Sequence, residues 1–191
     1  MQKIILASQS PRRKQLLEWA EIPFEIMVKE TDESYPAGLQ VTDTAVHIAR
    51  NKALAIKPSV NNNTAILAAD TIVVLHDNII GKPTDRIDAI NILSALSGQV
   101  HKVITGVVIL YADKEVAFAE TTEVHFYPLS QAQIIFYVDN YKPYDKAGAY
   151  AIQEWIGVTG IKSITGDFYN VMGLPVSRVV QAIDNLLTDG G

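Results

Sequence analysis

The apolar residues of this chain fall into short runs, several of them almost wholly apolar, which alternate with segments whose apolar residues recur every three or four positions. The first pattern predicts buried strands and the second predicts amphipathic helices. We expect strands over residues 3–7, 24–28, 65–75, 100–111 and 115–126. We expect helices that begin after Ser10, where Pro11 suits the first turn, and over residues 43–56, 85–96, 130–140 and 176–187. Strands that alternate with helices are typical of an α/β domain.

The connections between these elements are less regular. The two long strands are expected to form a hairpin through residues 112–114. Ser130 and Gln133 have the spacing of a capping box at the start of a helix. Residues 141–175 combine glycine, proline and short polar side chains, so we expect loops there. The length suggests one domain or one pair of lobes with a cleft, and no linker or low-complexity tract divides the chain, so we expect a single domain over residues 1–191.

Composition and charge narrow the class of protein by exclusion. The chain has 191 residues, is 48% hydrophobic and carries a net charge of −5, so it is too apolar for a disordered chain and too acidic for a broad nucleic-acid surface. No apolar run reaches the ~20 residues that span a bilayer, and the first residues lack the order of a signal peptide. The absence of cysteine excludes disulfides, thiolate zinc sites and a cysteine nucleophile, and it fits a reducing cytoplasm. We expect neither a membrane nor a nucleic acid as partner.

A basic turn follows the first predicted strand, where the first predicted helix begins. It places two hydroxyls, Ser8 and Ser10, beside three cations, Arg12, Arg13 and Lys14. The amide hydrogens and the dipole at a helix N-terminus favour anions, and arginine holds phosphate oxygens through a bidentate fork. The alternative is a capped helix with a solvated basic first turn, but each cation at this end of a helix costs about 0.3–1 kcal/mol. The turn therefore predicts a binding site for phosphate groups.

A single carboxylate, Asp70, lies in the middle of the most apolar predicted strand. Removing a carboxylate from water costs several kcal/mol unless the group is paired, binds a metal or faces a cleft. An ion pair, or a strand that ends earlier than predicted, would explain Asp70 without a function. The functional interpretation is a carboxylate that binds a metal or activates water, with Glu33 of the polar segment 29–33 as a second oxygen ligand. A glutamate in a loop is usually only solvated, so Glu33 alone is a weak signal.

Two lysines and a glycine-rich run complete the candidate residues. Lys52 lies inside an otherwise apolar helix and Lys82 follows Gly81; each is either a surface charge or a compact cation that can neutralise a polyphosphate. Residues 153–175 suit a binding loop but match no general phosphate fingerprint, and the P-loop, Rossmann and α/β-hydrolase motifs are absent from the sequence. The histidines are scattered without the spacing of metal ligands: His47, His76, His101 and His125.

Four motifs together closely resemble the Maf family: L-A-S-Q-S-P-R-R at residues 6–13, A-A-D-T-I-V at 68–73, G-K-P at 81–83 and the run 153–175. They occur in the family's order, and the resemblance covers nearly the whole chain. It implies an α/β fold with an elongated, twisted mixed sheet flanked by helices, two lobes and a central cleft, related to the inosine triphosphate pyrophosphatases. It also implies a cytoplasmic nucleoside triphosphate pyrophosphatase that uses a divalent metal, Mg²⁺ or Mn²⁺, and that is often a homodimer.

The resemblance also assigns roles to individual residues. Asp70 corresponds to the family's catalytic acidic residue. The family's other cleft residues correspond to Ser8, Arg13, Glu33, Lys52 and Lys82. The branch of the family that acts on dTTP and UTP is matched at three positions, Arg12, Thr71 and Gln153.

The reaction that the family implies makes clear demands on these side chains. Water must attack the α-phosphorus and pyrophosphate must leave, so catalysis consists mainly of positioning and charge neutralisation. We expect Asp70, with Glu33, to hold the metal and to orient or deprotonate the water. We expect the charge of the triphosphate to be taken by Arg13, Lys52 and Lys82.

The remaining candidates would bind the rest of the nucleotide. Ser8, Ser10 and the first amides of the helix are expected to hold phosphate oxygens. The side-chain amide of Gln153 can donate to O4 and accept from N3–H of uracil or thymine, whereas cytosine reverses that pattern. The alternative from another class is a non-catalytic nucleotide-binding regulator of septum formation and cell division, which needs the phosphate site but no water-activating carboxylate. Asp70 favours the enzyme.

Overall fold

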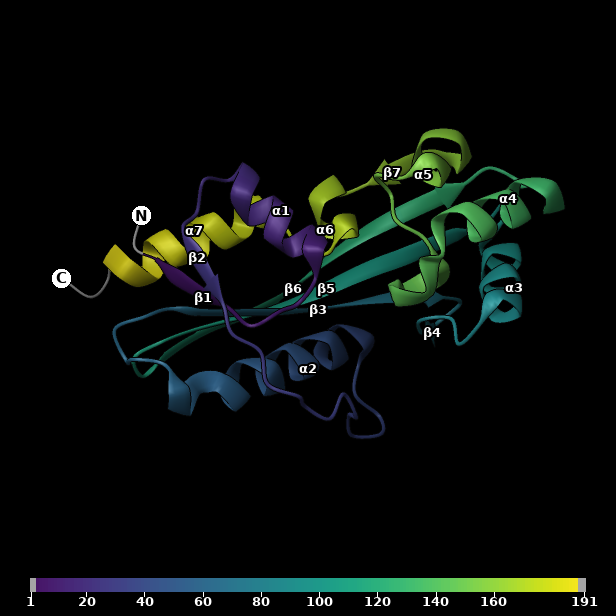
Figure 1. Ribbon diagram of the computed structural model, residues 1–191. Coiled ribbons are helices and arrows are strands. Elements are labelled where there is room, and N and C mark those ends of the chain that lie inside the picture. Colours follow the sequence, from purple (N-terminus) through teal and green to yellow (C-terminus); the bar gives the residue numbers. More distant parts are fainter. Residues whose placement is uncertain (1–2, 189–191) are drawn as a thin grey trace. The chain divides into compact units, whose positions relative to one another are not determined.

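The computed structural model describes residues 3–188, which form a mixed α/β structure (Figure 1). Its strands are β1 (Ile4–Leu6), β2 (Phe24–Ile26), β3 (Ile66–Leu75), β4 (Asn78–Ile80), β5 (Val100–Tyr111), β6 (Lys114–Phe126) and β7 (Ile161–Thr165). Its α-helices are α1 (Pro11–Trp19), α2 (Val41–Ile56), α3 (Arg86–Leu96), α4 (Gln131–Tyr141), α5 (Trp155–Gly160), α6 (Phe168–Met172) and α7 (Val176–Thr188). None of these helices is long and apolar enough to cross a membrane.

The strands form one sheet in the order β2-β1-β3-β5-β6-β7, and β4 pairs with β3 outside this path. β1 pairs in parallel with both β2 and β3, whereas β3 and β4, and also β6 and β7, are antiparallel. The sheet is therefore mixed, and the prediction of a mixed sheet flanked by helices is confirmed.

The chain divides into two compact units. Unit 1 consists of Met1–Thr71, Thr105–Glu120 and Gly173–Gly191, and its complete elements are β1, β2, α1, α2 and α7. Unit 2 consists of Ile72–Ile104 and Thr121–Met172, and it contains β4, β7 and the helices from α3 to α6. Strands β3, β5 and β6 each contribute residues to both units.

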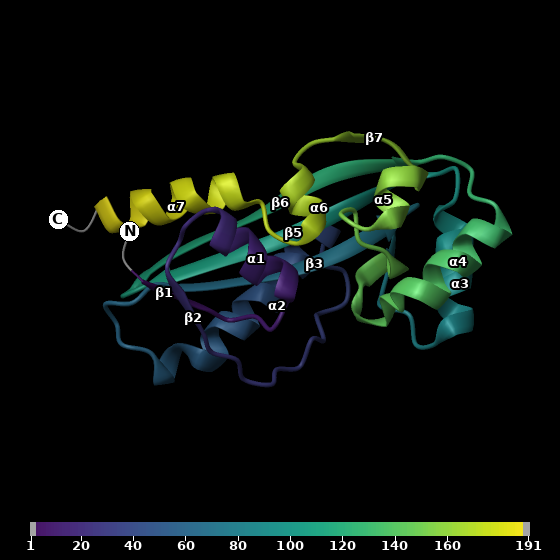
Figure 2. The same ribbon diagram turned by 45° about the horizontal axis from the view of Figure 1, so that its top comes forward.

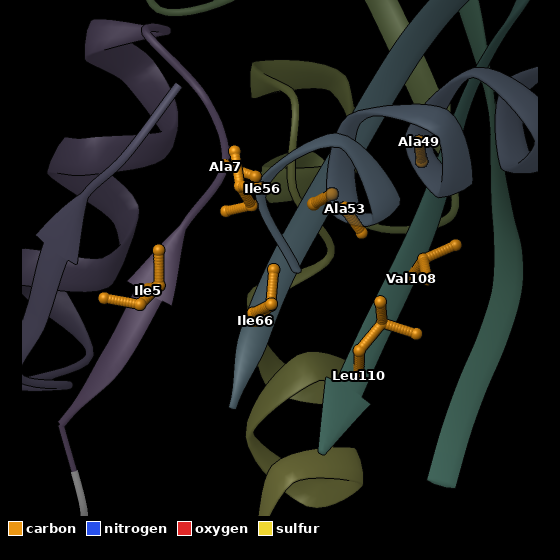
Figure 3. Packing of buried hydrophobic residues seen from close by; sticks show 9 residues of the cluster. Ile5, Ala7, Ala49, Ala53, Ile56, Ile66, Val108 and Leu110 are labelled. Carbon is orange, nitrogen blue, oxygen red and sulfur yellow. The ribbon is translucent and has the colours of Figure 1, made fainter. Parts of the chain in front are cut away.

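Unit 1 has helices on both faces of its strands (Figure 1 and Figure 2). α2 covers one face through a cluster of apolar side chains shared with β1, β3 and β5 (Figure 3): Ile5, Ala7, Ala49, Ala53, Ile56, Ile66, Ala68, Val108 and Leu110. α2 comes very close to β5, because a Cβ on Gly106 would lie 2.2 Å from the carbonyl carbon of Ala45. α1 and α7 cover the other face, where Leu17, Val179 and Ile183 are fully buried.

In unit 2, α3 and α4 pack against one another. The guanidinium of Arg86 in α3 forms an ion pair with Asp139 in α4, in which Nε lies 2.6 Å from Oδ1. The same two helices bury Leu93 and Val138. α4 begins with a capping box formed by Ser130 and its third helical residue, Gln133, as predicted.

Most predicted elements are present within two residues of the expected bounds, but three differences matter. The strand predicted over residues 24–28 ends at Ile26. Strand β4 was not predicted; it pairs with β3 across a turn in which His76 and Asp77 both have positive φ. The prediction of loops over residues 141–175 is wrong in part, because α5, β7 and α6 lie there. These elements have six, five and five residues, which is too short for a hydrophobic period to be visible.

Candidate functional site

Strand β3 carries two neighbouring candidates, Asp70 and Thr71, whose side chains leave the strand on opposite faces. Alternate side chains of a strand share a face. Asp70 therefore shares the face of Ile66 and Ala68, which pack against α2. Thr71 lies on the opposite face. Since Asp70 lies well inside β3, the alternative that the strand ends before it is excluded.

On the α2 face, Lys52 joins two carboxylates. Its Nζ lies 2.6 Å from Asp70 Oδ1 and 2.8 Å from Glu33 Oε1. The side chains of Lys52 and Asp70 are only 19% and 15% exposed, whereas that of Glu33 is 53% exposed. The ion pair that would explain Asp70 without a function is thus present, but the group is not sealed from solvent.

The same two carboxylates have the chemistry of ligands for a divalent cation. Because oxygens of both contact one ammonium, they converge on one small positive centre. Mg²⁺ in nucleotide sites usually takes one or two carboxylates and completes its shell with water and substrate phosphates. Within residues 3–188, no three histidine, aspartate or glutamate side chains gather into a metal site. The donor set fits a cation that the substrate helps to bind.

On the opposite face of β3, the guanidinium of Arg13 is held at three points. Its Nε donates to the carbonyl of Gly173 over 2.8 Å. Nη1 donates to Ser8 Oγ and Nη2 to Thr71 Oγ1, each over 3.0 Å. Gly173 has a φ of +121°, in the region that glycine tolerates best, and its carbonyl accepts from Arg13 in this conformation. Three segments that are distant in the sequence therefore fix one arginine.

Arg13 is buried, unlike the solvated cation that the alternative interpretation of the basic turn requires. It is 8% exposed, and burial lowers its pKa, while the charges of Asp70 and Glu33 act to raise it. An arginine nevertheless stays protonated at neutral pH, so the cation is permanent. A guanidinium has five N–H groups, and the three contacts leave one N–H on each Nη for a ligand. Arg13 is thus a fixed cation within electrostatic reach of both carboxylates.

The hydroxyl of Ser8 is arranged to donate. Its oxygen accepts from Arg13 Nη1 over 3.0 Å and from the Ser10 amide over 3.2 Å, which occupies both lone pairs and leaves the hydrogen. Ser10 caps α1, as predicted, by accepting from the Arg13 amide over 3.5 Å. The expectation that several helical amides bind phosphate needs correction, since Pro11 has no N–H and the Lys14 amide donates to the Ser10 carbonyl. Side chains supply most donors at this helix end.

Unit 1 contains most of the predicted site residues: Ser8, Ser10, Arg12, Arg13, Glu33, Lys52, Asp70 and Thr71. Arg12 is partly exposed, and its positive charge lies close enough to Arg13 to lower the pKa of Arg13. Within unit 1 the structure therefore assembles two separate sets of predicted residues. Asp70 and Glu33 meet at Lys52, and Arg13 contacts Ser8.

The other two candidates, Lys82 and Gln153, belong to unit 2, and both are exposed. The amide of Gly148 donates to the carbonyl of Gly81 over 3.1 Å. This bond joins the loop that carries Lys82 to the segment that leads to Gln153.

Gln153 lies on a segment braced by a buried tyrosine and by an ion pair. The hydroxyl of Tyr137 donates to Glu154 and accepts from the Ala151 amide over 3.1 Å. Lys146 is 8% exposed, and its Nζ lies 3.6 Å from Glu154 Oε1. Since these contacts fix residues on both sides of Gln153, its amide is presented from an ordered segment.

His101 is a buried residue of unit 2. Its Nε2 lies 2.8 Å from the hydroxyl of Tyr150, and its ring packs edge-on against Phe126. Burial lowers the pKa of His101 to about 4, so the imidazole is neutral at neutral pH. His101 is therefore a neutral packing residue of β5.

Neither Thr105 nor the brace formed by Tyr137, Lys146 and Glu154 was predicted from the sequence. Thr105 is fully buried in β5, and its hydroxyl lies 2.9 Å from that of Thr71. A polar residue within an apolar run was the signal that identified Asp70, and the same signal was available for Thr105. The brace had no comparable signal, because its members are separated in the sequence.

Known proteins resemble this chain over most of its length. Residues 3–186 match the model of a family described as Maf-like protein. A dTTP/UTP pyrophosphatase of Cytophaga hutchinsonii is 50% identical over 183 residues, which cover 96% of this chain and 84% of that protein. A dTTP/UTP pyrophosphatase of Parabacteroides distasonis is 48% identical over 182 residues, which cover 95% and 94%. The crystal structure of a nucleoside-triphosphatase, a dITP/XTP pyrophosphatase, from Mycobacterium abscessus aligns over 65% of this chain and 73% of its own, with a TM-score of 0.40 and 15% identity.

Proposed function

This chain belongs to the Maf family, and from that premise we propose that it is a dTTP/UTP pyrophosphatase, a hydrolase that releases a nucleoside monophosphate and pyrophosphate. The observation that carries the proposal is the position of Asp70, a carboxylate inside a strand that contacts Lys52 and lies within electrostatic reach of the fixed Arg13. Hydrolysis of an anhydride requires a carboxylate that can take a proton from water and cations that hold the phosphates.

Arg13 and Ser8 are the proposed phosphate ligands of unit 1. Each Nη of Arg13 keeps one N–H, and Ser8 keeps its hydrogen, so the three donors can meet phosphate oxygens without losing a contact within the protein. Because the guanidinium is already fixed, little side-chain freedom is lost when a phosphate binds. Arg12 and Ser10 lie on the same helix end and would add charge and a hydroxyl.

Asp70 is the proposed acceptor for a proton of the attacking water. Lys52 contacts its Oδ1, which leaves Oδ2 for the water. As the water oxygen bonds to the α-phosphorus, the bond from that phosphorus to the oxygen bridging the β-phosphorus breaks, and pyrophosphate leaves. Lys52 pairs with Asp70 before the reaction and can pair with the negative charge that develops on the phosphates. Lys82 is proposed from its charge alone to neutralise the pyrophosphate.

A divalent cation is part of the proposal, and Asp70 and Glu33 are the residues that would hold it. Mg²⁺ or Mn²⁺ bound there would neutralise phosphate charge as a Lewis acid. Pyrophosphate release from UTP should therefore fall by about a hundredfold or more when EDTA is added, and should return with excess Mg²⁺. Undiminished turnover in EDTA would contradict the assignment of the two carboxylates.

Gln153 is proposed to recognise the base. Its amide can meet both O4 and N3–H of uracil or thymine, whereas a glutamate cannot donate to O4. Gln153→Glu should lower kcat/KM for UTP and dTTP by about 10- to 100-fold, because a polar group left unpaired costs about 1–3 kcal/mol. Gln181→Glu, the same charge change at an exposed position of α7, serves as the control. An unchanged preference for UTP in Gln153→Glu would refute this role.

One assay separates the enzyme from the regulator of cell division. The purified protein is incubated with Mg²⁺ and with each nucleoside triphosphate in turn, and both pyrophosphate and orthophosphate are measured. Pyrophosphate from UTP and dTTP supports the proposal, and orthophosphate indicates a different phosphatase. Nucleotide binding without turnover supports the regulator.

Three further expectations complete the proposal. A single family domain over residues 1–191 and the homodimer that the resemblance implies remain predictions. Because UTP and dTTP are metabolites of the cytoplasm, we place the activity there.

A further inference from the structure

The hydroxyl of Thr71 contacts three groups of the protein. Its oxygen accepts from Arg13 Nη2 over 3.0 Å, lies 2.9 Å from Thr105 Oγ1 and is 3.5 Å from the Gly173 carbonyl. A hydroxyl has one hydrogen and two lone pairs. Its hydrogen points either to Thr105 or to Gly173, and one lone pair is always taken by Arg13. Thr71 is therefore committed within the protein at a position that matches the substrate-selective branch of the family.

Thr105 completes this arrangement from the neighbouring strand. It is fully buried in β5, directly beside β3 in the sheet. Because Thr71 accepts from Arg13 and also forms a hydrogen bond with Thr105, the contact with Thr105 helps to hold the Thr71 hydroxyl where it meets the guanidinium.

We propose that Thr105 is a positioning residue that fixes Arg13 through Thr71, and that both threonines act on the nucleotide by directing Arg13 toward the phosphates. The proposal rests on the proposed function only in so far as Arg13 binds the phosphate tail. It predicts that Thr71 and Thr105 behave as one unit with Arg13, and that their loss affects all nucleoside triphosphates alike.

The test compares Thr105→Val, which removes the hydroxyl but keeps the shape, with Thr105→Ser, which keeps the hydroxyl. Thr105→Val should lower kcat/KM for UTP by about 10- to 100-fold, as expected when a catalytic cation is misplaced by a fraction of an ångström to an ångström. Thr105→Ser should recover most of this loss. The ratio of kcat/KM for UTP to that for CTP should stay within about threefold of wild type in Thr105→Val and Thr71→Val.

Two controls separate positioning from a general loss of stability. Thr44→Val removes another buried hydroxyl, which donates to the Gln40 carbonyl over 3.2 Å in α2, and should leave kinetics unchanged. In an Arg13→Lys background, Thr105→Val should change kcat/KM by less than about threefold, because the guanidinium that Thr105 is proposed to direct is absent. A merely structural role would give the same loss in both backgrounds.

Three results would overturn the proposal: full activity of Thr105→Val, independent losses in the double variant, or a changed UTP to CTP ratio in Thr71→Val. A wild-type protein that releases no pyrophosphate would refute the proposed function instead. The positioning role is then decided by calorimetric titration with inorganic pyrophosphate. Thr105→Val must weaken that binding about tenfold and Thr105→Ser must not.

Discussion

Replacing Asp70 by asparagine should lower kcat for UTP hydrolysis by about 10²–10⁴-fold, which is the usual contribution of a positioned general base. The amide keeps the shape of the carboxylate, but it cannot accept a proton from water and would not balance the charge of Lys52 at 2.6 Å. Initial rates of pyrophosphate release at saturating UTP measure the effect. The slow variant should still bind UTP, because Arg13 and Ser8 are untouched.

Glu115→Gln is the matched control for this substitution. Glu115 of β6 forms an ion pair with Arg50 of α2 over 2.8 Å, so its loss also removes an ion pair to the same helix. If both variants lose similar stability and only Asp70→Asn loses turnover, the carboxylate acts on the reaction. Near-normal turnover of Asp70→Asn would remove Asp70 from the mechanism.

Arg13→Lys should lower kcat/KM for UTP by about 10²–10³-fold, the range seen when one charge-stabilising donor is removed. Lysine keeps the positive charge, but a single ammonium cannot meet Gly173, Ser8 and Thr71 in the fork geometry that the guanidinium uses. The variant should also unfold at lower urea concentration, because each buried group left unpaired costs about 1–3 kcal/mol.

Arg178→Lys in α7 makes the same substitution at an exposed ion pair with Glu120 and should leave the kinetics unchanged. If the lysine variant of Arg13 keeps activity within about threefold of wild type, charge alone suffices and the fixed guanidinium is not needed.

Asp70 could be identified from the sequence because a charged side chain in the middle of an apolar strand is visible in the local pattern alone. The strand was predicted over residues 65–75, and β3 runs from Ile66 to Leu75, so Asp70 does lie within an apolar strand. The basic turn was also correctly identified as the start of a capped helix. Both signals are local, and local patterns of hydrophobicity and capping can be read without knowledge of the fold.

The burial of Arg13 could not be predicted in this way. Its partners Thr71 and Gly173 lie 58 and 160 positions away, and only the fold brings them together. The same holds for Lys52, which the helical pattern placed beside apolar residues without indicating that two carboxylates would meet its Nζ. The prediction of loops over residues 141–175 failed for a different reason. Helices of five and six residues have too few turns for a hydrophobic period to be recognised.

The neighbouring positions of Asp70 and Thr71 place a strict limit on how β3 can change in length. One extra residue ahead of Asp70 within the strand would exchange the two faces for every side chain that follows. The carboxylate would then replace the threonine beside Arg13, and Lys52 would lose its partner. An insertion in the loop at residues 61–63, which precedes β3, would leave this alternation intact. Related chains of different length should therefore accommodate their extra residues in that loop and keep β3 itself at constant length.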